Sequence, residues 1–124
     1  MSIFSNFIPE PIQNQSSVGA LKKRLDWGEP ALTIIDVRTR DAFNTCRIQG
    51  SIPMPMDEPA TLTLASLELS RDIYLYAETD EQTAVAANQL RQAGYQNVAE
   101  LIGGLTAWKQ AKYPVEGGQK VNYA

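Results

Sequence analysis

The fold is decided by one stretch, DIYLYAETDEQTAVAANQL, which covers Asp72–Leu90. Its first five residues, Asp72–Tyr76, are rich in branched and aromatic side chains, which is typical of a buried strand. A polar turn follows, and the pattern from Thr79 to Ala93 predicts a helix with small apolar residues along one side, namely Ala86, Ala87 and Leu90. A strand, a turn and a helix in this order are typical of a chain that builds a parallel sheet.

The same alternation continues on both sides of this stretch. Further buried strands are predicted over Leu32–Val37 and Asn97–Ile102. Helices are predicted after a cap at Ser16 or Ser17, and over Thr39–Asn44, Thr63–Leu69 and Leu105–Lys112. Ile48–Met56 contains Gly50, Pro53 and Pro55, so it is predicted to be a turn with at most an edge strand. The pattern predicts an α/β fold with a parallel sheet that helices cover on both faces.

Composition limits both the size and the setting of this fold. The chain has 124 residues, of which 44% are hydrophobic and 20% charged, as expected for one folded domain. We predict an N-terminal arm or tail over residues 1–15 and a domain over residues 16–124. The formal net charge is −3 and no basic cluster is present, so we expect neither nucleic-acid nor membrane binding. A single cysteine and the lack of a basic, apolar leader predict a cytoplasmic protein.

The absence of histidine removes the commonest general base and the commonest zinc ligand. With one cysteine, Cys46, the chain has no multi-cysteine metal site, so no metal or other cofactor is expected. The remaining polar candidates follow the predicted strands, where open α/β folds place their sites. These candidates are Asp36 and Arg38 at the end of the first strand, Ala77 and Glu78 at the end of the second, and Gly103 and Gly104 at the end of the third.

Four motifs, in order over roughly residues 17 to 116, resemble the rhodanese-like domain family. They are LTIIDVRTRDAF (Leu32–Phe43), CRIQGSIPMP (Cys46–Pro55), the stretch from Asp72 to Leu90, and AGYQNVAELIGGLTAW (Ala93–Trp108). The resemblance implies a three-layer fold with a central five-stranded parallel sheet. It also implies sulfur transfer from thiosulfate or a persulfide, through a cysteine persulfide held in the loop C-x-x-G-x-R-S.

The resemblance places that nucleophile at Ala77, and alanine forms no persulfide. The glycine, arginine and serine of the loop fall at Asp80, Gln82 and Thr83. We therefore expect an inactive member, a pseudoenzyme, that binds a protein partner or regulates one. The recognition surface would be the degenerate loop, which consists of Ala77, Glu78, Thr79, Asp80, Glu81, Gln82 and Thr83.

The loop residues also have a simpler interpretation. Thr79 and Gln82 have the spacing of a capping box, and Asp80 and Glu81 complement a helix dipole. These residues then serve only to start a helix. Glu78 and Asp80 are also oxygen donors for a hard cation, although two carboxylates without a ligand-rich loop are weak support for a metal.

Cys46 provides the alternative function, a sulfurtransferase with a relocated nucleophile. Arg47 follows it, and a guanidinium beside a thiol favours the reactive thiolate. A simple small side chain and reversible oxidation are the other interpretations of Cys46. The resemblance implies that Asp36 and Arg38 support the loops by charged hydrogen bonds, with ligand binding as the alternative. Four aromatic residues are expected in the core or at its rim, and they are Trp27, Tyr76, Tyr95 and Trp108. The sequence leaves the oligomeric state open, including a shared oligomer with a catalytic relative.

Overall fold

The computed structural model describes residues 12–28, 31–57 and 67–118. Its strands are β1 (Gln15–Ser16), β2 (Leu32–Asp36), β3 (Arg47–Ile48), β4 (Ile52–Pro53), β5 (Asp72–Tyr76), β6 (Asn97–Leu101) and β7 (Val115–Glu116). Its helices are α1 (Val18–Asp26), α2 (Arg40–Thr45), α4 (Asp80–Gln92) and α5 (Gly104–Gln110). In the described ranges, strands and helices alternate as the sequence pattern predicts, except that β3, β4 and β5 follow one another.

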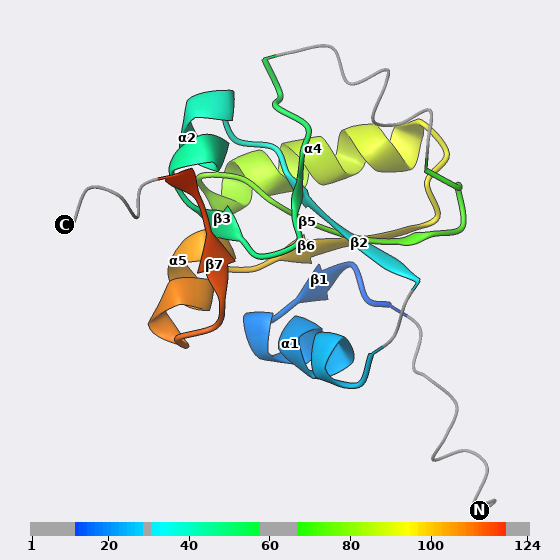
Figure 1. Cartoon of the computed structure of the whole chain (residues 1–124). Helices are drawn as coiled ribbons and strands as arrows, with labels where there is room; N and C mark the ends of the chain where they lie inside the picture. The colour runs from blue at the N-terminus through cyan, green and yellow to red at the C-terminus, as the bar shows by residue number, and fades with distance from the viewer. Residues whose placement is uncertain (1–11, 29–30, 58–66, 119–124) are drawn as a thin grey trace, which may run out of the picture.

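The main sheet has five strands in the order β1-β6-β5-β2-β4, and all neighbours are parallel. Helices α1 and α5 lie on one face of this sheet and α4 lies on the other (Figure 1). The prediction of a three-layer α/β fold with a five-stranded parallel sheet is therefore confirmed. Strands β3 and β7 form a separate antiparallel pair in which Ile48 lies opposite Val115.

The alternation of side chains along the strands divides the core into two clusters. On the α4 face, Ile35, Ile73, Leu75 and Val98 pack against Ala86, Ala87 and Leu90 of the helix. On the opposite face, Ile34, Tyr74, Tyr76 and Leu101 pack against Leu21 of α1 and Trp108 of α5. Strands β2, β5 and β6 are thus covered on both sides, which explains why most of their residues are apolar.

The ends of the elements follow from local chemistry. The Ser17 side chain caps α1 by accepting from the Ala20 N–H, and the Thr39 side chain caps α2 by accepting from the Ala42 N–H. At the turn before α5, Gly103 has φ +81°, and a Cβ there would lie 2.6 Å from the Ala107 Cβ. Glycine is therefore needed at this turn for both conformation and space.

Some predicted features differ from the structure or fall outside it. The helix predicted over Thr63–Leu69 falls mostly on residues 58–66, which lie outside the described ranges, and residues 67–69 are not helical. The first eleven residues of the predicted arm also lie outside these ranges, whereas Gln15 belongs to β1 and pairs with Glu100. Trp108 is fully buried, but Trp27 is 85% exposed at the end of α1, so its expected place in the core or at its rim is wrong.

In the part of the chain that the structure describes, no helix has the length and apolar character that crossing a membrane would require.

Candidate functional site

Three loops meet at the carboxyl end of the sheet, because β2, β5 and β6 are parallel neighbours. They join β2 to α2, β5 to α4 and β6 to α5. The last two are in direct contact, since a Cβ on Gly104 would lie 3.4 Å from the Ala77 carbonyl oxygen. The Gly103 N–H also donates to the Asp80 carboxylate at 3.0 Å. The structure therefore brings together the candidate residues that the sequence places at the ends of β5 and β6.

Ala77 lies at the start of the loop that joins β5 to α4, and its side chain is buried. Its N–H donates to the Thr83 hydroxyl oxygen at 2.9 Å. The same hydroxyl donates to the Thr79 carbonyl oxygen at 3.0 Å. Thr83 is only 1% exposed, so one buried hydroxyl links both ends of the loop. We call this arrangement the Thr83 clasp.

The other end of the loop is a capped helix start. The Thr79 hydroxyl accepts from the Gln82 N–H at 3.1 Å, and Asp80 and Glu81 lie in the first turn of α4. The predicted cap at Thr79 is thus present, and the first-turn carboxylates complement the helix dipole. Three carboxylates, those of Glu78, Asp80 and Glu81, are exposed at this rim.

Three of the seven backbone N–H groups of Ala77–Thr83 are bonded to oxygens of the same segment. The N–H groups of Ala77 and Gln82 are bonded to the threonine hydroxyls, and the Thr83 N–H donates to the Thr79 carbonyl oxygen. An anion site of the kind found at helix N-termini uses such groups to contact its ligand. The loop instead satisfies these donors with its own oxygens.

A buried ion pair supports the neighbouring loop. Arg38 contacts both carboxylate oxygens of Asp36, with Nη2 2.7 Å from Oδ2 and Nε 3.0 Å from Oδ1. Asp36 is fully buried and Arg38 is 8% exposed. The Arg38 guanidinium also donates to the carbonyl oxygens of Ala42 and Cys46. This cation therefore ties the end of β2 to α2 and to the residue that precedes β3.

The surroundings hold Arg38 in its charged form. Burial lowers the pKa of Arg38, but the hydrogen bonds and charge of Asp36 outweigh it and leave the pKa raised, with a smaller contribution from Glu78. The guanidinium carbon lies 5.5 Å from the centre of the Tyr76 ring. Arg38 is thus a cation close to the degenerate loop, but it is already neutralised by Asp36.

Tyr76 is a buried residue of the site that sequence reasoning treated only as an aromatic. Its hydroxyl accepts from the Ile48 N–H at 3.1 Å and lies 3.4 Å from the Ser51 hydroxyl. Burial raises the pKa of Tyr76, and the Asp36 carboxylate raises it further, so the phenol stays neutral. It therefore anchors β3 to the end of β5. No pattern in the sequence marks this role, because Ile48 and Tyr76 are far apart along the chain.

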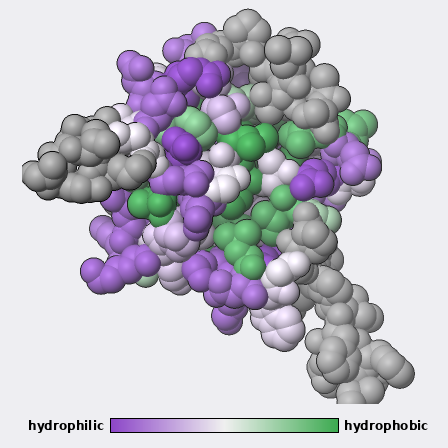
Figure 2. All heavy atoms as spheres, in the orientation of Figure 1, coloured by the Kyte–Doolittle hydropathy of each residue, from purple (hydrophilic) through white to green (hydrophobic). Residues whose placement is uncertain are grey.

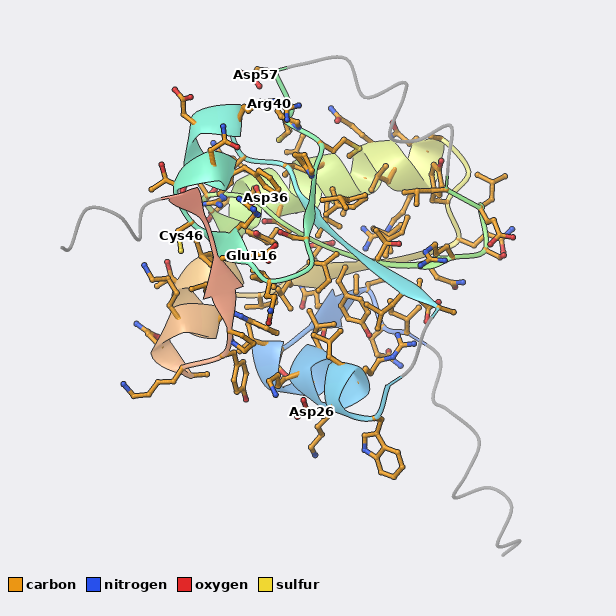
Figure 3. The ribbon with its side chains drawn as sticks, viewed as in Figure 1. Asp26, Asp36, Arg40, Cys46, Asp57 and Glu116 are labelled. Carbon is orange, nitrogen blue, oxygen red and sulfur yellow. The ribbon has the colours of Figure 1, made fainter. Side chains whose placement is uncertain are left out.

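Cys46 lies between the end of α2 and the start of β3 (Figure 3). Its thiol is free and partly exposed. Its N–H donates to the Ala42 carbonyl oxygen at 3.1 Å, and its own carbonyl accepts from Arg38. The Arg47 guanidinium lies over the Phe43 ring at 4.4 Å and pairs with Glu116 at 3.4 Å. These contacts direct the Arg47 charge toward α2 and β7.

The donor set for a metal is poor in the ranges described, where no group of three or more cysteine, aspartate or glutamate side chains is placed to hold a metal ion.

Comparisons with known proteins point in one direction. The chain is 50% identical to the rhodanese-like domain of the Alr3790 protein from Anabaena sp., with a TM-score of 0.81 over 86% of this chain and 81% of that one. It is 26% identical over 102 residues to a sulfurtransferase from Allochromatium vinosum, covering 82% of this chain and 94% of that protein. It is also 25% identical over 77 residues to the adenylyltransferase and sulfurtransferase uba4 of Ogataea parapolymorpha, covering 62% of this chain.

This chain spans 20% of the length of the Ogataea protein, and 48% and 49% of the length of two further curated relatives. The family model of the rhodanese-like domain matches residues 17–111, which include four of the five strands of the main sheet, the described helices and the loops discussed above. This chain belongs to the rhodanese-like domain family.

Proposed function

We propose that this rhodanese-like domain transfers no sulfur through residue 77 and acts as a binding or regulatory module. The observation that carries the proposal is the degenerate loop itself. Ala77 has no thiol to form a persulfide, and the Thr83 clasp occupies its N–H. The scaffold around the loop is complete, with the sheet and the Asp36–Arg38 pair in place.

The charge at the rim supports the same proposal. Glu78, Asp80 and Glu81 are exposed, whereas Arg38 beside them is buried and paired with Asp36. An anionic sulfur donor would meet repulsion at such a rim, and solvent would weaken this repulsion without changing its sign. A protein partner with a basic contact surface would instead be attracted and oriented.

Affinity capture with matched variants tests the binding role. One bait carries Glu78→Gln, Asp80→Asn and Glu81→Gln, which removes three negative charges and keeps an acceptor for the Gly103 N–H. The control bait carries Gln89→Lys, Gln92→Lys and Gln96→Lys, which changes the net charge equally at three other exposed positions. We expect a protein that the native and control baits retain and the loop bait loses. Equal capture by all three baits would contradict a recognition role for the loop.

A sulfurtransferase that uses Cys46 is the second candidate function. The observation in its favour is that Cys46 is partly exposed and has a free thiol. The backbone carbonyl of Cys46 also accepts a hydrogen bond from Arg38 at the rim of the site. In that reaction the Cys46 thiolate would attack the outer sulfur of thiosulfate. The S–S bond of thiosulfate would break, sulfite would leave with the electron pair, and a persulfide would remain on Cys46. Cyanide would then take the outer sulfur as thiocyanate and restore the thiolate.

Thiocyanate formation from thiosulfate and cyanide separates the two functions. We expect no turnover from the native chain or from Cys46→Ser. Turnover that the native chain shows and Cys46→Ser loses would establish the second candidate. An Ala77→Cys variant tests whether the rest of the loop admits the sulfur donor. If this variant forms no thiocyanate, the acidic, internally bonded loop excludes the donor even when a thiol is present.

A further inference from the structure

A groove lies at the opposite end of β2 from the candidate site. It has a volume of about 490 Å³, and its walls include Leu25, Leu32, Ile34, Ile52, Leu67 and Arg71. We call it the β2 edge groove. It is within the size range of cavities that bind ligands or side chains. None of the degenerate-loop residues lines it, so it is separate from the site discussed above.

The groove exists because β4 is short. Strand β4 has two residues and pairs only with Ile35 and Asp36 of β2. The first part of β2, Leu32–Ile34, continues beyond this partner and forms one wall of the groove. An edge of this kind is usually covered in folded proteins.

The walls of the groove combine apolar and polar side chains, since Thr33, Gln49, Glu68 and Arg71 line it beside the apolar residues. Leu25, Leu32, Ile52 and Leu67 are each only partly buried, and apolar side chains gather at the centre of the face shown in Figure 2. Arg71 donates to the Thr33 hydroxyl and to the Leu32 carbonyl oxygen, so its guanidinium is held against β2. The apolar part of these walls, which is only partly buried, favours an occupant with apolar side chains.

The sequence that precedes the first described residue contains such apolar side chains. Residues 3–8 read IFSNFI, with apolar side chains at Ile3, Phe4, Phe7 and Ile8. Ile12 packs against the same core cluster as Leu25 and Leu32, two residues of the groove. The chain from Ile8 to Ile12 can span about 14 Å, since an extended residue covers roughly 3.5 Å. The chain is therefore anchored beside the groove, with an apolar segment within reach.

We propose that Ile3–Ile8 of the same chain occupy the β2 edge groove and cover the first part of β2. The segment brings two aromatic and two branched side chains, and the groove offers apolar walls from α1, β2 and β4. Burial of these side chains supplies the driving force. This inference does not depend on the function proposed for the degenerate loop.

Paramagnetic broadening in the full-length chain tests this directly. A nitroxide is attached at Ser5→Cys in a Cys46→Ser background, because Cys46 does not line the groove. We expect the methyl signals of Leu32, Ile52 and Leu67 to lose most of their intensity, while those of Val85, on the exposed side of α4, keep theirs. Uniformly retained signals would overturn the proposal.

Two controls determine what causes the broadening. Phe4→Asp with Phe7→Asp is expected to restore the groove signals, whereas Ser2→Asp with Asn6→Asp adds the same charge and is expected to leave the broadening in place. Broadening that survives the phenylalanine changes would contradict an apolar contact. Mixing isotope-labelled chains with separate nitroxide-bearing chains is expected to give none, because broadening in the mixture would mean that the segment reaches a second copy.

Discussion

Thr83 joins the two ends of the β5–α4 loop through one buried hydroxyl. Thr83→Val keeps the shape of the side chain but leaves the Ala77 N–H without its partner. An unsatisfied buried donor costs about 1–3 kcal/mol, and we expect a loss of this size in the free energy of unfolding. Urea denaturation at neutral pH measures it. Thr83→Ser retains the hydroxyl and should lose less, so equal losses in both variants would contradict the role of the clasp.

The Asp36–Arg38 pair is the most deeply buried ion pair that the structure describes. Arg38→Met would leave the Asp36 carboxylate buried without a counter-charge, and we expect it to lower the free energy of unfolding by about 3–5 kcal/mol. Lys22→Met is the matched control, because Lys22 pairs with an Asp26 side chain that is 62% exposed. Its expected loss is at most about 1 kcal/mol. Losses of similar size in the two variants, measured by urea denaturation, would contradict this assignment.

Tyr76 is expected to make the fold sensitive to alkali. Burial and the Asp36 carboxylate raise the pKa of Tyr76 above the ordinary value of 10.0. The corresponding stability is fully present below that value, and it is lost as the pH rises because only the unfolded chain ionises its tyrosine easily. The native urea midpoint should therefore fall more steeply than that of Tyr76→Phe between about pH 9 and about pH 11. The other tyrosines are present in both proteins, so they affect both urea midpoints equally. Urea midpoints that fall in parallel with pH in the native chain and in Tyr76→Phe would therefore contradict this prediction.

At the scale of single elements, the start of α4 depends on its cap. The Thr79 hydroxyl accepts from the Gln82 N–H, which has no partner within the helix. Thr79→Ala should lower the free energy of unfolding by about 1 kcal/mol, and Thr79→Ser should restore most of it. Thermal unfolding of the two variants and the native chain provides the measurement. A Thr79→Ala variant as stable as the native chain would show that the loop does not depend on its cap.

The sequence predicted the long elements well because their patterns are local. Strand β5 has the predicted bounds, and α4 spans Asp80–Gln92, where Thr79–Ala93 was predicted. Strands β1 and β7 were missed, because each has two residues and exists only through pairing with a distant segment. A strand of two residues has no periodicity that a sequence pattern could reveal.

The same distinction applies to the candidate site. The positions of Asp36, Ala77 and Gly103 after their strands could be predicted, because the ends of parallel strands meet at one edge. The contacts among them could not, since the Thr83 clasp and the bond from Gly103 to Asp80 depend on side-chain directions. Trp27 was misplaced for a related reason. Its aromatic side chain suggested the core or its rim, but it lies one residue beyond the end of α1 and points into solvent.

At the scale of the whole molecule, the scaffold meets the loop at Ala77, which belongs to the core cluster on the α4 face. The two core clusters and the Asp36–Arg38 pair hold the strand ends in place, and none of these contacts requires a cysteine at residue 77. The loop between β5 and α4 can therefore change its chemistry without loss of the sheet. At the carboxyl end of the sheet, this loop presents the exposed carboxylates of Glu78, Asp80 and Glu81.

The central claim is that this rhodanese-like domain carries no persulfide. Intact-mass spectrometry of the full-length native chain after incubation with thiosulfate tests it most directly, because a persulfide adds the mass of one sulfur atom. The Ala77→Cys variant, treated in the same way, shows whether the loop accepts sulfur when it has a thiol. We predict that the native chain keeps its unmodified mass. A gain of one sulfur atom that disappears in Cys46→Ser would contradict the claim and make Cys46 the nucleophile.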